Sequence, residues 1–144
     1  MKRSTPITEI ETRALANRFF AVVNRGGSRA ELQKFFLYPD ARLHGPNGRA
    51  YAFDEYLQTH AKWSHEQHVL SDWATVPLSS TPPRARIVGN LYWEARYRKG
   101  GGRIRTVVTE EWIVERVADG SLRIVLYHAR LLHPLPDSAK VDFE

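Results

Sequence analysis

Apolar side chains recur at the helical period in the first third of the chain, and this pattern predicts three helices. The first covers residues 8–24, where Thr8 and Glu11 have the spacing of a capping box. Its apolar face consists of Leu15, Phe19, Val22 and Val23. A short second helix ends before Pro39, and a third covers residues 52–63.

The rest of the chain follows the alternating pattern of β-strands. We expect one short strand and four long ones, at 41–44, 68–76, 84–98, 103–117 and 121–132, with a proline-rich loop at 77–83. Asp119-Gly120 is a strong hairpin signal, and a two-residue turn there sets Glu111 opposite His128. A four-residue loop at 99–102 would set Glu94 opposite Val107. Helices first and strands last indicate the α+β class.

These registers give the sheet two unlike faces. One is aromatic and aliphatic: Leu91, Trp93, Tyr97, Val108, Trp112, Val114 and Tyr127. The other is apolar at one end (Val88, Ile113, Leu122, Ile124, Leu126) and polar at the other (Asn90, Tyr92, Glu94, Thr109, Glu111, His128). Since neither looks like a solvent face, we expect helices to cover one face and a second copy of the chain to cover the other, as a homodimer.

Length and composition narrow the class of protein. The 144 residues (16.6 kDa) suit a single domain over 1–144 with loose ends at about 1–7 and 134–144. There is no cysteine and no apolar run near the roughly 20 residues of a membrane helix, so we expect neither thiolate chemistry nor a membrane partner. Without a signal-peptide pattern, we expect a cytoplasmic protein.

The formal net charge of +5 raises the possibility of nucleic-acid binding. The basic residues concentrate at the ends of two predicted strands: Arg84, Arg86, Arg96, Arg98, Lys99, Arg103 and Arg105. Charged strand ends also protect a sheet against edge pairing. We therefore favour a solvated hairpin tip, or steering of an anionic ligand, over a nucleic-acid partner.

Two segments resemble motifs of the nuclear transport factor 2-like superfamily, and of its SnoaL-like and scytalone dehydratase-like groups in particular. One is Phe-Phe-Leu-Tyr-Pro-Asp-Ala-Arg-Leu at 35–43, and the other is Glu-Trp-Ile-Val-Glu at 111–115 before Asp119-Gly120. The likeness covers residues 8–132. It implies a cone in which three N-terminal helices pack on a curved, mainly antiparallel sheet and enclose a pocket for a small, largely apolar molecule. It implies no cofactor and no metal.

The resemblance also supplies site residues. His68 stands where dehydratase-like members carry a histidine, and Glu94 stands near the position of its partner group. The expected cross-strand pair of Glu111 and His128 adds a carboxylate that could orient an imidazole as a base. The alternative interpretations are a strand-end histidine for His68 and a structural ion pair for Glu111.

The sequence departs from the family at three positions. Gly45 precedes Pro46, where the isomerases carry an aspartate base, and Phe19 replaces their oxyanion tyrosine. Asn24 replaces the acidic residue that the dehydratases have near the end of the first helix. These departures argue against chemistry of the ketosteroid isomerase type.

The expected substrate-binding residues combine core aromatics with polar residues of the sheet: Phe19, Phe36, Tyr56, Trp63, Asn90, Tyr92 and Thr109. Three nearby histidines (His60, His65 and His68) fit no metal-binding spacing. The resulting hypothesis is cofactor-free acid/base catalysis of a dehydration, isomerisation or cyclisation, by the catalytic set His68, Glu94, Glu111 and His128. The alternative is a non-catalytic ligand-binding or dimerisation module with the same fold.

Overall fold

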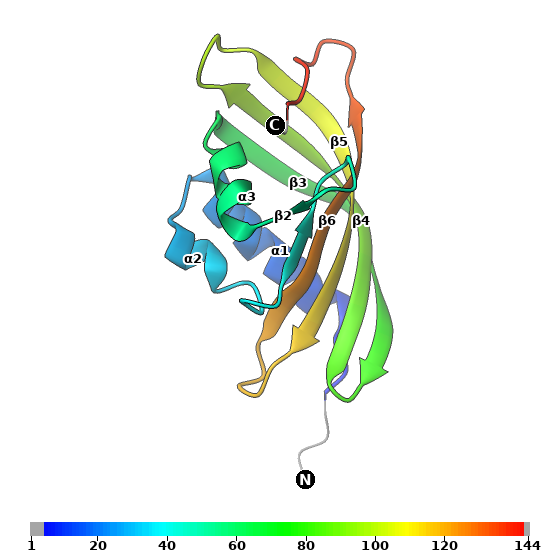
Figure 1. Ribbon diagram of the computed structural model, residues 1–144. Helices are drawn as coiled ribbons and strands as arrows, with labels where there is room; N and C mark the ends of the chain where they lie inside the picture. The colour runs from blue at the N-terminus through cyan, green and yellow to red at the C-terminus, as the bar shows by residue number, and fades with distance from the viewer. Residues whose placement is uncertain (1–4, 143–144) are drawn as a thin grey trace.

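The computed structural model describes residues 5–142 as one curved sheet with helices on its inner side (Figure 1). The helices are α1 (Glu9–Asn24), α2 (Arg29–Gln33) and α3 (Phe53–His60). The strands are β1 (Arg42–His44), β2 (Ala50–Tyr51), β3 (Trp63–Ser80), β4 (Pro83–Tyr97), β5 (Arg103–Arg116) and β6 (Leu122–Pro134). Their order is β2-β1-β6-β5-β4-β3, and only β1 with β6 is a parallel pair. The expected α+β class and mainly antiparallel sheet are confirmed.

Capping boxes set the starts of α1 and α2, and the one at Thr8 and Glu11 was predicted. At α1, the backbone N–H of Glu11 donates to Thr8 Oγ1, and the backbone N–H of Thr8 donates to the Glu11 carboxylate, both at 3.2 Å. Ser28 and Glu31 repeat this arrangement at α2. The reciprocal bonds satisfy donors that a helix start leaves unpaired.

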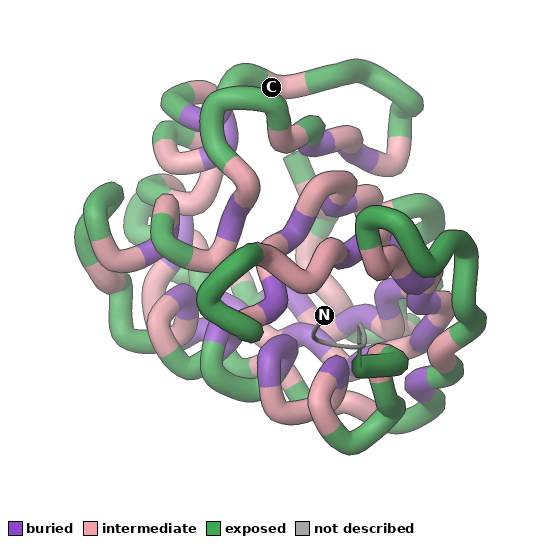
Figure 2. Tube along the Cα trace, turned by 90° about the horizontal axis from the view of Figure 1, so that it is seen from below, coloured by how far each residue is buried: buried purple, intermediate pink, exposed green. Residues whose placement is uncertain are grey.

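The buried core lies between the helices and the inner face of the sheet, and Figure 2 shows the buried stretches gathered inside the molecule. Phe19 packs edge-on against Phe36 and Trp112. Trp73 packs edge-on against Trp112, and its ring rests on Gly89, where an added Cβ would lie 2.3 Å from Trp73 Cε3. Glycine at position 89 therefore makes room for the Trp73 ring.

β3 is longer at both ends than the predicted strand at 68–76. Trp63, expected at the end of the third helix, pairs with Tyr97 instead. The predicted proline-rich loop at 77–83 reduces to a turn at Thr81 and Pro82. Because β3 is an edge strand, it accommodates Pro77, which lacks a backbone N–H to donate.

The registers of the two hairpins show which predictions about the two faces of the sheet are correct. Trp112 lies opposite Tyr127 and Glu111 opposite His128, as predicted. Glu94 lies opposite Arg105 rather than Val107, a shift of two residues. Since side chains alternate with period two, a shift of two keeps each residue on its expected face.

The prediction for the start of β6 was wrong because of a β-bulge in its pairing with β5. The pairing shifts by one residue between Ile113 and Val114, so Val114 lies opposite Ile124. That single-residue shift turns Ile124 and Leu122 from the outer face to the inner face, where both are buried.

A second bulge reverses the alternation at the start of β3. His65 and Glu66 lie between the paired residues Ser64 and Gln67, whereas only Ala95 lies between their partners on β4. His65 has a φ of 54°, a left-handed conformation that is unfavourable for a residue with a Cβ. The extra residue brings Glu66 and His68 to the inner face.

The C-terminal segment packs on the sheet, although we expected a loose end from 134. The backbone N–H of Ala139 donates to the Arg103 carbonyl at 2.7 Å, and Tyr97 Oη donates to the Lys140 carbonyl at 2.8 Å. At the other end, Arg116 donates to the carbonyls of Thr5 and Pro6, and the rest of the expected loose start lies outside the described residues. None of the helices in residues 5–142 is long and apolar enough to span a membrane.

Candidate functional site

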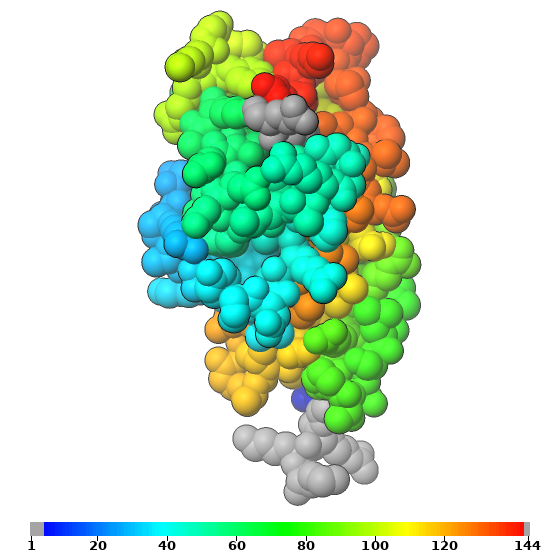
Figure 3. All heavy atoms as spheres, viewed as in Figure 1, coloured from blue at the N-terminus to red at the C-terminus, as the bar shows by residue number. Residues whose placement is uncertain are grey.

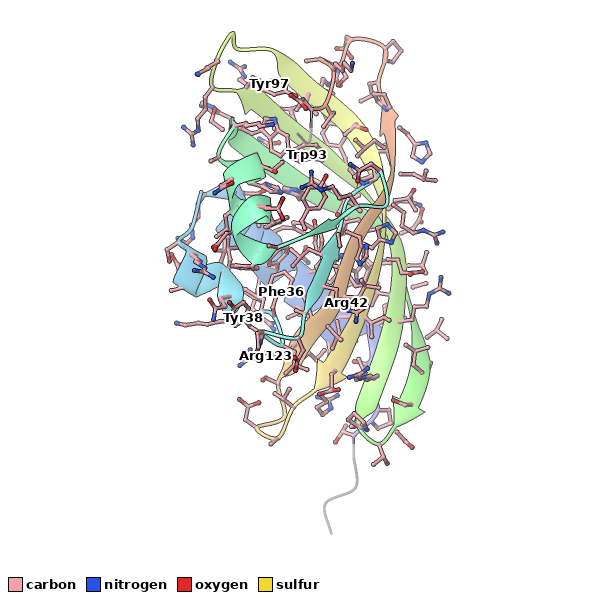
Figure 4. All side chains as sticks on the ribbon, viewed as in Figure 1. Phe36, Tyr38, Arg42, Trp93, Tyr97 and Arg123 are labelled. Carbon is pink, nitrogen blue, oxygen red and sulfur yellow. The ribbon has the colours of Figure 1, made fainter. Side chains whose placement is uncertain are left out.

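A small cavity lies between α3, β1 and the inner face of β4, β5 and β6. Its volume is about 50 Å³, and most of its wall is apolar: Leu43, Leu91, Trp93, Val108, Ala129 and Leu132. Its polar side chains are Tyr51, Tyr56, Thr59, His60, His68, Glu110 and Tyr127, together with His44. Figure 3 shows how α3 and the β1–β2 segment cover this side of the sheet, and Figure 4 labels Trp93 on the sheet close to α3.

The β1–β2 segment restricts the size of the cavity. A cavity of roughly 150 Å³ is needed for benzene, so a ligand of that size requires a side chain to move. Tyr51 lies against Gly45, where an added Cβ would come within 2.6 Å of the Tyr51 ring. Asn47 Nδ2 donates to Tyr51 Oη at 3.2 Å. The space that an aspartate base would need at position 45 is therefore filled by Tyr51.

His68 is held as a neutral imidazole by its surroundings. Its Nδ1 lies 2.6 Å from Asn24 Oδ1, and its ring stacks on Phe20 with centroids 4.3 Å apart. An amide oxygen only accepts, so Nδ1 carries the proton and Nε2 is left as an acceptor. Burial lowers the pKa of His68 to about 3, and neutral Asn24 does not stabilise the imidazolium as a carboxylate would.

Glu110 is a carboxyl group inside the aromatic layer. Only 2% of the residue is exposed. Its oxygens accept from Trp112 Nε1 at 2.7 Å and from Tyr127 Oη at 3.0 Å. Burial raises the pKa of Glu110 to about 7, although these two donors favour the charged form. At neutral pH the group is therefore divided between its acid and its carboxylate forms.

Tyr56 adds a hydrogen-bond donor to the same cavity. The residue is 8% exposed, and its hydroxyl lies close to the Tyr127 hydroxyl but makes no well-aligned hydrogen bond among residues 5–142. Burial raises the pKa of Tyr56 well above its usual value, so the hydroxyl keeps its proton. A buried hydroxyl without a well-aligned hydrogen bond is unfavourable, and a ligand oxygen or a water in the cavity would satisfy it.

A third unit couples α3 to the bulge in β3. His60 Nδ1 lies 3.1 and 3.3 Å from the two carboxylate oxygens of Glu66, which also accept from Trp93 Nε1 at 3.1 Å. Burial alone would raise the pKa of Glu66, but the charge and the hydrogen bond of His60 lower it below its usual value. Glu66 is therefore ionised at neutral pH.

The four expected catalytic residues do not converge. His68 lies in the cavity, whereas Glu94, Glu111 and His128 belong to the opposite, outer face of the sheet. Glu94 accepts from Arg103 at 2.6 Å, and Glu111 pairs with Arg86. The physical reason is alternation, because Glu110, not Glu111, shares the face of Trp112.

The expected substrate-binding residues also divide between the two faces. Of these residues, Tyr56 lines the cavity, whereas Phe19, Phe36 and Trp63 are core side chains outside its wall. Asn90, Tyr92 and Thr109 lie on the outer face: Thr109 Oγ1 donates to Asn90 Oδ1 at 2.7 Å, and Tyr92 Oη donates to Glu94 at 2.8 Å.

Sequence reasoning missed Glu110, His60 and Glu66. A signal for Glu110 was present, since the predicted register already put it on the aromatic face beside Trp112 and Tyr127. Glu66 carried no such signal, because a bulge determines its orientation. Within residues 5–142, no group of three histidine, aspartate or glutamate side chains is placed to hold a metal ion.

The raised pKa of Glu110 predicts a pH dependence of stability. Between its usual pKa of 4.5 and about 7, the folded chain holds a proton that the unfolded chain has released, so this stabilising contribution is lost as the pH rises through that window. Glu110→Gln removes this slope. In urea unfolding, the stability of the variant relative to wild type should rise by about 3 kcal/mol between about pH 5 and pH 8.

The comparison of wild type with Glu110→Gln isolates the contribution of Glu110 to the pH dependence of stability. His68 has a lowered pKa and gives the opposite slope below 6.5, but it is present in both proteins and cancels in the difference. A difference in stability that does not change with pH would contradict the account of Glu110.

Solved structures with the same architecture exist at low sequence identity. An NTF2-like protein from Cytophaga hutchinsonii superposes with a TM-score of 0.66 at 10% identity, covering 90% of this chain and 100% of that one. A candidate scytalone dehydratase from Novosphingobium aromaticivorans gives 0.73 at 14% identity, covering 91% and 87%. A hexachlorocyclohexane dehydrochlorinase, LinA-type3, from Novosphingobium barchaimii gives 0.66 at 15% identity, covering 92% and 96%.

No protein-family model matches the sequence, and no curated protein matches it significantly. Identities of 10 to 15% carry no residue roles from these structures to this chain. The superpositions nevertheless cover nine-tenths or more of the chain, including both the helices and the curved sheet. The chain has the nuclear transport factor 2-like fold.

Proposed function

We propose that this protein is an enzyme that moves a proton on a small, largely apolar carbonyl compound without a cofactor. The observation that carries the proposal is the Glu110 carboxyl group, which is buried in an apolar cavity and titrates near neutral pH. A general base or acid works best when its pKa lies near the working pH. Glu110 meets this condition. We propose a carbonyl substrate because the Tyr56 hydroxyl in the same cavity can donate a hydrogen bond to a carbonyl oxygen.

Glu110 and Tyr56 divide the work in this proposal. The Glu110 carboxylate takes a proton from the carbon next to the carbonyl group. The Tyr56 hydroxyl donates a hydrogen bond to the carbonyl oxygen, which becomes negative as the proton leaves. The hydroxyl already lies in the cavity wall and makes no well-aligned hydrogen bond among residues 5–142, so it is available to a ligand once a side chain of the wall moves to admit it.

His68 has a different role from the one we expected. As a neutral imidazole with its Nδ1 proton committed to Asn24, it offers Nε2 as an acceptor to a substrate hydroxyl. Its lowered pKa makes it a weaker base than Glu110. The dehydrochlorinase and dehydratase names of the structural neighbours support chemistry of the same kind, in which a proton leaves carbon.

Exchange of ketone protons with solvent tests this function without knowledge of the natural substrate. Cyclopentanone is incubated with the protein in D₂O, and loss of the signal from the protons beside the carbonyl is followed by NMR. We expect the wild-type rate to exceed that of buffer and to rise with pH through about 7, as Glu110 ionises. Glu110→Gln should lower the rate by about 100-fold or more.

Glu111→Gln is the matched control, because it makes the same change on the adjacent residue of the outer face. Its rate should equal that of wild type. A wild-type rate equal to buffer, or a rate that survives in Glu110→Gln, would exclude the proposed catalysis. Saturable binding of cyclopentanone without exchange would instead favour a non-catalytic binding module.

We also propose that a second copy of the chain covers the outer face of the sheet. Val69 and Leu131 are 58% and 56% exposed there. The same face carries charges of both signs, with Arg130 Nη1 3.6 Å from Glu111 and Arg105 near Glu94. A face with both apolar and oppositely charged groups can complement itself across a two-fold axis.

Light scattering after size exclusion tests this arrangement. Leu131→Asp should convert a dimer to a monomer, because it buries a charge in the apolar contact. Leu78→Asp is the control, since Leu78 is also exposed but lies near the turn between β3 and β4. A monomeric wild-type protein, or equal effects of the two substitutions, would contradict the proposed dimer.

A further inference from the structure

We propose that a surface cleft beside the cavity binds the carboxylate of an elongated substrate, so that the enzyme acts on keto acids. In this arrangement the ketone group reaches Glu110 and Tyr56 in the cavity, while the acid group stays outside, at Arg98. The inference rests on the proposed function and names the substrate class of that site, a ketone whose carboxylate lies several bonds from the carbonyl.

The cavity is too small to hold a whole substrate. Its volume is about 50 Å³, whereas benzene requires roughly 150 Å³. A second space, a surface cleft of about 410 Å³, lies between the end of α1, α2, α3 and the start of β3. The cavity therefore suits the reacting end of a longer molecule, and the cleft has room for the rest of it.

The two spaces are separated by two aromatic side chains. Tyr56 and His60 belong to the walls of both spaces, and their ring centroids lie 4.4 Å apart. Tyr56 is buried, whereas the His60 side chain is 18% exposed. A ligand that occupies both spaces therefore passes beside His60, and the width of an aromatic ring places several bonds between its two polar ends.

The charge of the wall differs between the two spaces. Within residues 5–142, no lysine or arginine lines the cavity, and Glu110 is the acidic group there. Burial of a ligand carboxylate in the cavity would leave its charge unpaired, which is costly. The wall of the cleft instead contains three arginines, Arg25, Arg29 and Arg98. A ligand with a ketone and an acid group is therefore favoured with its acid group in the cleft.

Two of the three arginines already have carboxylate partners. Arg25 donates from both of its Nη atoms to Glu31. Arg29 Nε lies 3.2 Å from Asp54 Oδ1, in the first turn of α3. The charges of these two arginines are therefore already balanced by neighbouring side chains.

Arg98 is the arginine of the cleft that remains for a ligand. Its Nε donates to the Ala61 carbonyl at 3.1 Å, which holds the guanidinium just beyond the end of α3. Among residues 5–142, no carboxylate is paired with Arg98, so its two Nη atoms can donate to the oxygens of a ligand carboxylate. Glu66, the acidic residue in the described wall of the cleft, is already held by His60 Nδ1 and Trp93 Nε1, each at 3.1 Å.

The cleft also suits the chain that joins the two polar ends of such a ligand. Part of its wall is apolar, formed by Val23, Leu32, Leu57 and Ala61. An aliphatic chain lying against these side chains removes apolar surface from water, which is favourable. A small inorganic anion would leave this part of the wall in water, so the cleft matches an acid with an apolar body.

A matched pair of ketones tests this inference. 6-Oxoheptanoate and 2-heptanone have the same chain and differ in one group, a carboxylate in place of the terminal methyl group. Exchange of the protons beside the carbonyl is followed by NMR in D₂O, at low ketone concentration and about 0.15 M salt, which screens distant charges. The wild-type rate should be about tenfold higher for 6-oxoheptanoate, because a hydrogen bond to a charged group contributes free energy of that order.

Two arginine variants separate a local contact from a general effect of charge. In Arg98→Gln, the ratio of the two exchange rates should fall to about one. Arg96→Gln is the matched control, since Arg96 is exposed near the end of β4, two residues before Arg98, and does not line the cleft. Its ratio should stay at about ten. Equal losses in the two variants would overturn the assignment of Arg98.

A binding measurement tests the cleft without any chemistry. The Nε–H signals of the arginine side chains are observed by nitrogen-15 NMR while 6-oxoheptanoate is added to the wild-type protein. The Arg98 signal is identified by its absence in Arg98→Gln, and the Arg96 signal by its absence in Arg96→Gln. We expect the Arg98 signal to shift until it saturates and the Arg96 signal to stay in place. An Arg98 signal that does not shift would contradict the proposed contact.

The outcomes separate this inference from the proposed function. Exchange that depends on Glu110 but does not favour 6-oxoheptanoate, or favours it equally in Arg98→Gln, would overturn the inference and keep the function. A saturating shift of Arg98 without exchange of either ketone would overturn the function and keep the cleft as a binding site for the acid. Absence of both shift and exchange would overturn both. Thermal melts of the variants confirm that each is folded at the assay temperature.

Discussion

The site depends on the burial of one carboxyl group, that of Glu110, in the aromatic layer of the core. Glu110 receives hydrogen bonds from Trp112 and Tyr127, but no cation of the described residues 5–142 lies beside it to balance its charge. Burial therefore favours the protonated form and brings the titration of the group to neutral pH. The same burial that makes Glu110 costly to ionise makes it able to exchange a proton under ordinary conditions.

The sheet supplies the positions of the other polar groups through its irregularities. An ideal β3 would alternate without interruption and would present Glu66 and His68 to the outer face. The bulge at His65 reverses this order and brings both side chains to the inner face, beside Trp93 of β4. Local distortion of one edge strand thus places the Glu66 carboxylate beside His60 and the His68 ring beside Asn24.

Much of the fold follows from local pattern, because local interactions determine it. The capping boxes at Thr8 and Ser28 mark helix starts at single-residue precision. The face of the sheet that Trp112 and Tyr127 occupy follows from alternation. The error of two residues in the predicted register of the glycine hairpin leaves the face of each residue unchanged. The bulges cannot be predicted in this way, since their stability comes from packing between strands distant in sequence. For that reason Ile124 was assigned to the outer face, and Glu66 was not assigned to either face.

The central claim is that Glu110 titrates near neutral pH inside the folded protein. Carbon-13 NMR of glutamate-labelled protein measures this directly, with the Glu110 side-chain carboxyl signal identified by its absence in Glu110→Gln. We predict a midpoint near pH 7 for this carboxyl carbon. A midpoint near 4.5, the value of an exposed glutamate, would contradict the account.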